Sequence, residues 1–256
     1  MQNKIDKISA WIKEKVDSAG CKGVVFGLSG GIDSAVVAVL CSEVFNSDQM
    51  LGIIMPCESQ KEDAEDAHLV ASNLDIKTET FDLGQTYESL SPHSLVGVPY
   101  NKLANANLKA RLRMATLYYF ANTFSYLVVG TGNKTEIMVG YGTKYGDGGV
   151  DIQPIGGLYK TEVFEMARVL GLPEKIINKA PSAGLWKGQT DEEEMGITYE
   201  KLDAILKSLN AYFSSSCEFR KFCNTENITT EDFDKVQKMI SRSQHKREMP
   251  PICPIE

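Results

Sequence analysis

The 256-residue chain lacks the features typical of membrane, secreted and zinc-cluster proteins. No apolar run approaches the roughly 18 residues that a membrane-spanning helix needs. The chain has six cysteines, none of them in a C-x-x-C pair. The two nearest, Cys217 and Cys223, are not at a usual zinc spacing, so reduced thiols are a better interpretation than a metal site or disulfides.

Basic residues are fewer than acidic ones, 27 against 34. The formal net charge is -7, which argues against a general nucleic-acid binder because phosphate backbones attract basic surfaces. Residues 1–16 carry charges throughout, which predicts an amphipathic helix and not a secretory signal. We therefore expect a cytoplasmic protein with neither a nucleic-acid nor a membrane partner.

The hydrophobic pattern alternates between two periods over the first half of the chain. Short apolar runs predict strands at 23–28, 51–56, 76–82 and 126–130. Helical spacing of apolar residues predicts helices at 34–45, 60–74 and 102–124. This alternation predicts an α/β fold, a doubly wound (Rossmann-like) parallel sheet with helices on both faces.

The second half is expected to add helices within 160–179 and 198–243, the latter forming extra C-terminal helices. We expect a single domain over residues 1–256, with a core of about 20–180 and a C-terminal helical part of about 181–256. Between them, the glycine-rich run 140–160 predicts a loop that packs closely on something, although a plain linker is an alternative. The stretches 84–101 and 182–197 are expected to be loops.

One predicted crevice collects the candidate ligand loops. Ligands of open parallel sheets sit beyond the carboxyl ends of the strands. The loops 29–34, 55–60 and 131–136 each follow a predicted strand. They are therefore expected to line the same crevice.

The segment Ser29-Gly30-Gly31-Ile32-Asp33-Ser34 lies between a predicted strand and a predicted helix. Its glycines let several N–H groups converge, and the helix N-terminus adds its dipole, which makes a cradle for an anion such as phosphate. Asp33 would repel phosphate unless a cation lay between them, so it implies Mg²⁺. The alternative is that Asp33 and Ser34 only cap the helix.

This strand-SGGIDS-helix unit resembles the pyrophosphate loop of the N-type ATP pyrophosphatases, which adenylate a carbonyl or carboxylate. Four further segments are similar to those of the ammonia-dependent NAD synthetases: NLKARLRM at 107–114, GTGNKTE at 130–136, TKYGDGG at 143–149 and HKR at 245–247. The resemblance covers roughly residues 5–250. One departure is Gly132-Asn133, where family members often have Asp-His.

The resemblance implies an ATP site and a metal site. The ATP-binding residues it implies are Gly27, Leu28, Ser29, Gly30, Gly31, Ile32, Asp33, Ser34, Met55, Gln60, Thr131, Lys160 and Ser182. Asp33 and Glu136 would hold Mg²⁺. For Glu136 an exposed first-turn glutamate is the alternative, and for Met55 and Gln60 ordinary packing and a polar helix start.

The resemblance also implies a second substrate, deamido-NAD, with contacts from Arg111, Lys144, Asp147, Asp151, His245 and Lys246. Arginine and lysine suit its carboxylate and pyrophosphate. For Asp147 two roles stay open, holding a ribose or ordering the glycine loop, and a lone HKR is more often a solvated charge run.

The implied reaction is the last step of NAD biosynthesis. Deamido-NAD is adenylated by ATP, releasing pyrophosphate, and ammonia displaces AMP to give NAD⁺. Asp33, Lys160 and Asp147 are the catalytic candidates. Ammonia would be free or come from a separate partner, since the 22 or so residues before the first strand hold no glutamine amidase domain.

Two other functions remain open at this point. One is another adenylating ligase with an SGGxDS loop, for instance one acting on tRNA. The other is a nucleotide-binding module without catalysis. The family is homodimeric, and the predicted helix 102–124 has enough apolar surface to form the interface, although a buried core helix explains the same pattern.

Overall fold

The computed structural model describes residues 1–91, 98–186, 188–209 and 216–255. Its centre is a four-stranded sheet in the order β3-β2-β1-β4. The strands are β1 (Gly23–Gly27), β2 (Met50–Ile54), β3 (Lys77–Thr80) and β4 (Tyr126–Val128), and every pairing is parallel. Val24 pairs with Met50 on one side and with Leu127 on the other. The four predicted strands and their parallel arrangement are confirmed.

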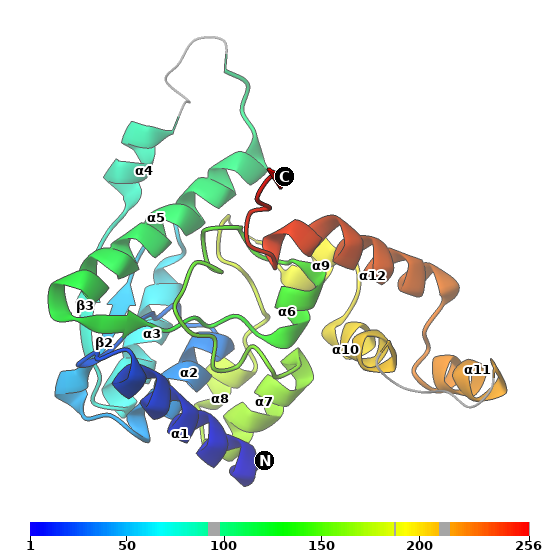
Figure 1. Cartoon of the computed structure of the whole chain (residues 1–256), viewed down its shortest axis with the longest axis horizontal. Coiled ribbons are helices and arrows are strands. Elements are labelled where there is room, and N and C mark those ends of the chain that lie inside the picture. Colours follow the sequence, from blue (N-terminus) through cyan, green and yellow to red (C-terminus); the bar gives the residue numbers. More distant parts are fainter. Residues whose placement is uncertain (92–97, 187, 210–215, 256) are drawn as a thin grey trace.

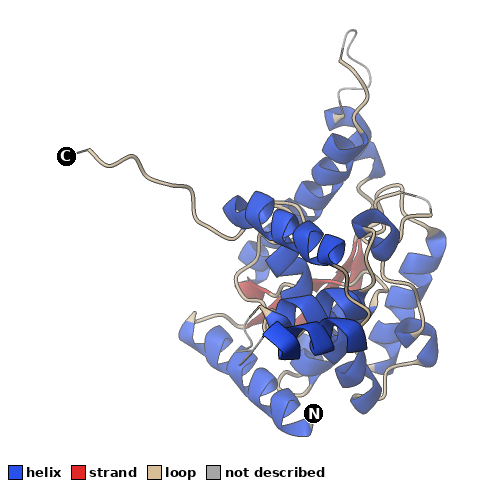
Figure 2. Ribbon diagram, turned by 90° about the vertical axis from the view of Figure 1, so that its right-hand side faces the viewer, coloured by secondary structure: helices blue, strands red, loops and turns tan. Residues whose placement is uncertain are grey.

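Alternate strand residues pack into two different cores, because successive side chains of a strand point to opposite faces. Val24 and Phe26 belong to a core shared with α1 (Gln2–Ser18), α2 (Ile32–Ser42), α3 (Lys61–Asn73), α7 (Lys160–Val169) and α8 (Glu174–Ile177). Val25 and Val128 belong to a core shared with α4 (Gly84–Leu90) and α5 (Lys102–Phe124). Helices therefore cover both faces of the sheet (Figure 2).

The strand order places a topological switch between β1 and β4. From β1 the chain moves outward through β2 to β3, and β4 then returns to the other side of β1. Loops that leave β1 and β4 therefore diverge and open a crevice at the carboxyl ends of these two strands. The loop before α2 and the loop before α6 (Lys134–Val139) are the ones that flank it.

A third core forms where the C-terminal helices pack on α6. It joins Val139, Tyr199, Leu202 and Val236, all buried. The helices here are α9 (Asp191–Met195), α10 (Tyr199–Ser208), α11 (Ser216–Thr225) and α12 (Thr230–Ser243), followed by the short helix η3 (Gln244–Lys246). Figure 1 shows α10 and α12 set to one side of the sheet, beyond α6.

Four predicted segments differ in detail from the structure. The segment 160–179 contains two helices, since Gly171 has φ 69° and Pro173 follows two residues later. The segment 198–243 contains three helices, with 210–215 outside the described residues. The expected loops 84–101 and 182–197 contain the short helices α4 and α9. A further short helix, η1 (Ser47–Gln49), precedes β2.

In the part of the chain that the structure describes, no helix combines the length and apolar character that crossing a bilayer requires.

Candidate active site

The loop after β1 is tightly folded by its own hydroxyls. Ser29 Oγ lies 3.0 Å from Ser34 Oγ, and the Gly31 N–H donates to Ser29 Oγ at 3.2 Å. Gly31 caps α2, whose first turn contains Asp33. Leu28 and Ile32 are buried, so only their backbones are available to a ligand.

Gly30 is required by the space around it. It has φ 76°, and a Cβ at this position would lie 2.3 Å from the Asp63 carbonyl oxygen of α3. Lys179 packs behind the same turn, with Nζ 2.9 Å from Asp63 and 2.7 Å from Asp66. The sequence reasoning missed this ion-pair cluster, which fixes the loop against α3.

The centre of the site is an ammonium group shared by two carboxylates. Lys160 Nζ lies 2.5 Å from Asp33 Oδ2 and 3.1 Å from Glu136 Oε1. The Lys160 side chain is 2% exposed, whereas those of Asp33 and Glu136 are 19% and 18% exposed. These three residues come from the starts of α7, α2 and α6, so the switch point brings all of them together.

Asn133 joins the two carboxylate loops. Its side chain is fully buried and donates from Nδ2 to Asp33 Oδ1 at 2.9 Å. Its Oδ1 accepts the Glu136 N–H at 3.0 Å and so caps α6. In the sequence, Asn133 was only a departure from the family pattern, although an asparagine three residues before a glutamate is a signal for a helix cap.

A buried aspartate on α10 places the lysine. Asp203 Oδ2 accepts the Thr161 N–H at 2.8 Å, and its other oxygen accepts the hydroxyl of Thr135. Thr135 Oγ1 in turn accepts the Lys160 N–H at 2.9 Å. These bonds satisfy the free N–H groups at the start of α7 and hold Lys160 toward α6.

Burial raises the pKa of Glu136 to about 7, although Lys160 opposes the shift. For Lys160, burial alone would lower the pKa, but the charges of Asp33 and Glu136 outweigh it and raise the pKa above its usual value. Lys160 therefore stays an ammonium at physiological pH, and Glu136 prefers a further positive charge nearby.

The same two carboxylates fit a divalent cation. Mg²⁺ needs few protein ligands because it keeps waters and takes phosphate oxygens. The carboxylates of Asp33 and Glu136 both face the Lys160 ammonium, and both remain partly exposed toward the crevice. No group of three or more His, Cys, Asp or Glu side chains gathers at a possible metal site among the described residues, so phosphate oxygens or water would complete the shell.

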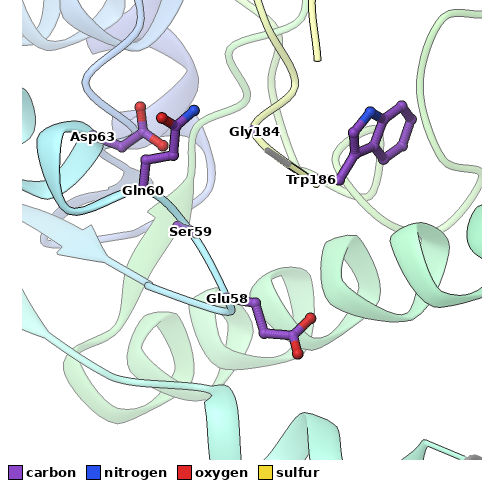
Figure 3. A pocket seen from close by; sticks show the side chains of 6 residues that line it. All are labelled: Glu58, Ser59, Gln60, Asp63, Gly184 and Trp186. Atoms are coloured by element: carbon purple, nitrogen blue, oxygen red, sulfur yellow. The ribbon is translucent and has the colours of Figure 1, made fainter. Parts of the chain in front are cut away.

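A cavity of about 310 Å³ lies beside the phosphate loop and is lined by Glu58, Ser59, Gln60, Asp63, Gly184 and Trp186. Gln60 and Asp63 lie on one wall and Trp186 on the opposite one (Figure 3). Ser182 lies near its rim, where its Oγ accepts the Gly184 N–H at 3.1 Å.

The other residues implied for ATP are placed less directly. The Met55 side chain is buried in the core between the sheet and α5, as in its alternative packing interpretation, and approaches Gly27. Its carbonyl accepts from Arg113 Nε at 3.2 Å, and Arg113 also donates to Ser59 Oγ at 3.1 Å. Arg113, which the sequence reasoning missed, thus holds the loop after β2. Thr131 lies half-buried between β4 and α6.

A second cluster surrounds the glycine-rich run. Lys144 Nζ donates to the His245 carbonyl, and Lys246 Nζ donates to the Gly140 and Gly142 carbonyls, each at 2.7 Å. The Lys144 carbonyl accepts from Arg111 at 3.3 Å. The structure therefore joins α5, the 140–149 loop and η3 at one place.

Two aspartates of the predicted set have structural partners. Asp147 Oδ1 accepts the Thr143 N–H at 2.7 Å, so Asp147 orders the glycine loop, one of the two roles it could have. Desolvation raises the pKa of Asp147, although its hydrogen bonds oppose the shift. Asp151 accepts from Tyr118 Oη at 2.9 Å and from the Val128 N–H at 2.8 Å.

Comparison with known proteins places this geometry in a family. Residues 4–250 match the family described as NAD synthase. The chain is 49% identical over 253 residues to an NH(3)-dependent NAD(+) synthetase of Carboxydothermus hydrogenoformans, covering 98% of this chain and 97% of the relative.

Two solved structures share the fold over nearly their full length. An NMN synthetase from Francisella tularensis has a TM-score of 0.87 at 33% identity, covering 99% of this chain and 98% of that one. An NH3-dependent NAD synthetase from Campylobacter jejuni, in complex with the nitrate ion, has a TM-score of 0.80 at 30% identity with the same coverage. With a crevice, a phosphate loop and a family match that spans nearly the whole sequence, the chain belongs to the NAD synthase family.

Proposed function

We propose that this chain converts deamido-NAD, ATP and ammonia into NAD⁺, AMP and pyrophosphate. The observation that carries the proposal is the Lys160 ammonium held between Asp33 and Glu136, directly beside the phosphate loop. This arrangement provides an ammonium group, and two carboxylates that could hold a divalent cation, where a pyrophosphate leaving group would develop negative charge. Stabilising such charge with fixed groups is a large part of enzymatic rate enhancement.

ATP would lie across the crevice with its phosphates on the Ser29–Ser34 loop. The hydroxyls of Ser29 and Ser34 and the Gly31 N–H hold the loop in a tight turn, and α2 begins there with its free N–H groups. The base and ribose of ATP would extend toward the cavity that Gln60 lines. Asp33 and Glu136 would hold Mg²⁺, which when bound neutralises charge on the phosphate oxygens.

The first step forms the activated carbonyl. A nicotinate carboxylate oxygen of deamido-NAD attacks the α-phosphorus of ATP, and the bond from that phosphorus to the pyrophosphate breaks. Lys160 and the loop N–H groups stabilise the departing charge. Catalysis here needs positioning and electrostatics and no covalent intermediate on the protein.

The second step uses ammonia. Its nitrogen attacks the acyl carbon, AMP leaves with the electrons of the carbon–oxygen bond, and the nitrogen loses a proton to Asp147 or to water. The cluster of Arg111, Lys144 and Lys246 is basic and lies where an anionic dinucleotide would be held. Asp151 and the His245 side chain would complete that site.

The assay is direct. The chain is incubated with ATP, Mg²⁺, deamido-NAD and ammonium, and NAD⁺ and AMP are measured. Equal amounts of the two products are expected, with none in the absence of ammonium. No NAD⁺ from a folded protein, beside an active control enzyme, would contradict the proposal.

A mononucleotide substrate is the second candidate, because one of the similar structures is that of an NMN synthetase. The same assay with nicotinic acid mononucleotide separates the two. We expect a higher kcat/KM for deamido-NAD, since the NH(3)-dependent NAD(+) synthetase of C. hydrogenoformans is more similar, at 49% identity against 33%. A preference for the mononucleotide would replace the substrate but keep the chemistry. We further propose that the protein works in the cytoplasm as a homodimer.

A further inference from the structure

A buried chain of hydrogen bonds leads away from the Glu136 carboxylate. The Tyr199 hydroxyl lies 3.2 Å from Glu136 Oε1 and 2.9 Å from Asp191 Oδ2. Tyr199 is 2% exposed and its ring also faces Lys160, with Nζ 5.0 Å from the ring centroid. One phenol therefore touches both Glu136 and a second, deeply buried carboxylate.

Asp191 uses its other oxygen to hold a loop. Its Oδ1 accepts the Ala183 N–H at 3.0 Å and the Tyr141 hydroxyl at 2.9 Å. Its own N–H donates to the Pro181 carbonyl at 3.0 Å. Asp191 thus fastens the beginning of the loop 181–191 to its end, and it is 4% exposed.

This loop forms part of the nucleotide cavity. Gly184 and Trp186 line the cavity, and the Leu185 carbonyl accepts from the buried Lys109 at 2.9 Å. The loop is therefore anchored to α5, and its Trp186 lies across the cavity from Gln60 (Figure 3). A shift at Asp191 would move the residues that border a bound nucleotide.

A purely local role for Asp191 does not explain these contacts. It is the first residue of α9, where an acidic side chain often serves the helix N-terminus. Its carboxylate, however, accepts from Ala183, Tyr141 and Tyr199, all of which lie outside α9. A carboxylate only accepts hydrogen bonds, so these three donors fix its position.

We propose that Tyr199 and Asp191 are positioning residues that couple the Glu136 carboxylate to the loop 181–191. The Tyr199 hydroxyl, which can donate its single proton to only one of the two carboxylates at a time, sets the orientation of Glu136 and links it through Asp191 to the loop that borders the nucleotide. Cation binding at Asp33 and Glu136 then restrains the described part of this loop, residues 181–186 and 188–191. This inference rests on the metal role in the proposed function. Partners of metal-holding carboxylates commonly alter metal affinity when they are removed.

The test uses cation binding and one fluorescent reporter, neither of which needs turnover. The chain has two tryptophans, so Trp11→Phe leaves Trp186 of the loop as the single one. Mn²⁺ affinity is measured by electron paramagnetic resonance with α,β-methylene-ATP present. Acrylamide quenching of Trp186 is followed while Mg²⁺ is added.

In the Trp11→Phe background, Mg²⁺ is expected to reduce quenching of Trp186. Tyr199→Phe is expected to weaken Mn²⁺ binding about tenfold and to abolish the response of Trp186 even at saturating Mg²⁺. Asp191→Ala is the second variant, in case the first fails to fold. It is expected to lose the Trp186 response with a smaller change in Mn²⁺ affinity.

Tyr126→Phe is the matched control, because it removes a tyrosine hydroxyl that donates to the Asp48 carbonyl at 2.6 Å, at the amino-terminal ends of β1 and β4, opposite to the crevice. This variant should keep both the Mn²⁺ affinity and the Trp186 response to Mg²⁺. Unchanged Mn²⁺ affinity in Tyr199→Phe, or a Trp186 response that survives in it, overturns the inference. If the expected binding results appear but no NAD⁺ forms, only the proposed function is contradicted, and the inferred coupling stands.

Discussion

Asp33 shares the ammonium of Lys160 with Glu136, so the choice of substitution at Asp33 decides what is measured. Alanine would leave the buried Lys160 with one carboxylate, and breaking a buried pair costs about 3–5 kcal/mol of stability. Asp33→Asn keeps a polar group beside Asn133 and Lys160. We expect it to lower pyrophosphate release roughly 10²–10³-fold, comparable to losing one preorganised charge-stabilising group. Single-turnover pyrophosphate assays, with melting curves to verify folding, measure this; near-normal release would remove the charge role of Asp33.

Gly30 allows a second prediction, because two separate reasons require glycine there. Its φ is 76°, and an added Cβ would meet the Asp63 carbonyl at 2.3 Å. Gly20 has φ 66° but nothing within 4 Å of an added Cβ. Gly20→Ala should cost about 1 kcal/mol, as measured by urea unfolding.

Gly30→Ala should cost more than Gly20→Ala and weaken ATP binding at least tenfold, as measured by calorimetry, because the loop must shift away from Asp63. Equal effects on stability in the two variants, with ATP affinity retained, would show that the close approach to α3 does not matter.

For individual residues, the sequence could indicate which side chains belong to the site but not which side chains they contact. Asp33, Glu136 and Lys160 stand in recognisable segments, and the structure brings them together. Tyr199 and Asp191 lie over 50 residues further along the chain from Glu136 in an ordinary amphipathic pattern. The contact of Tyr199 with Glu136, and through it that of Asp191, depends on how α10 packs on α6, which no local spacing encodes.

At the scale of elements, the packing of α3 is stabilised by ion pairs of a buried aspartate, Asp66. Asp66 is 2% exposed and its carboxylate lies 2.5 Å from Lys175 and 2.7 Å from Lys179. Burial alone would raise the pKa of Asp66, but the hydrogen bonds from Lys175 and Lys179 outweigh it and hold the pKa below its usual 3.8. The unfolded chain therefore binds this proton more readily, so the ion pairs stabilise the fold above pH 3.8 and less as the pH falls below it.

Asp66→Asn should thus lower the free energy of unfolding by about 1–3 kcal/mol at pH 6. The difference from the unsubstituted chain should shrink as the pH falls below 3.8. Urea unfolding at pH 6, 4.5 and 3 measures both. Asp17→Asn, in an exposed pair with Lys13, is the control and should change stability by less than about 0.5 kcal/mol. A difference that stays constant with pH would mean that Asp66 acts through packing and not through its charge.

Helix boundaries show why the elements could be predicted only in part. The predicted helix 102–124 matches α5, which begins at an Asn101 cap and ends at Ser125 with φ 60°. In 160–179 the apolar spacing continues past Gly171 and Pro173, so periodicity alone joined two helices. The backbone preferences of those two residues decided the outcome.

For the whole molecule, the order of the strands makes the site. Asp33 and Glu136 are 103 positions apart in the sequence, and meet only because β4 returns beside β1. The sequence predicted four parallel strands and a shared ligand edge. It did not predict which strands are neighbours, because strand order depends on the packing of helices on both faces.

The remaining whole-molecule prediction concerns the proposed homodimer. An aromatic patch, made of Phe81, Tyr119, Phe120, Phe124 and Tyr126, covers the C-terminal half of α5. Phe81 is 46%, Tyr119 68% and Phe124 45% exposed, which is unusual for neighbouring aromatic side chains of a monomer. Sedimentation equilibrium should give about twice 28.3 kDa.

Tyr119→Glu would place an unpaired carboxylate in that contact, whose desolvation is costly. We therefore expect Tyr119→Glu to raise the dimer dissociation constant at least a hundredfold. Val169→Glu, at a 50% exposed apolar residue of α7 in the opposite layer, is the control and should stay dimeric. Since the monomer would keep Asp33, Glu136 and Lys160 from a single chain, it should still bind ATP. A Tyr119→Glu protein that remains dimeric would move the interface away from this face of α5, and an active monomer of the unsubstituted chain would remove the dimer itself.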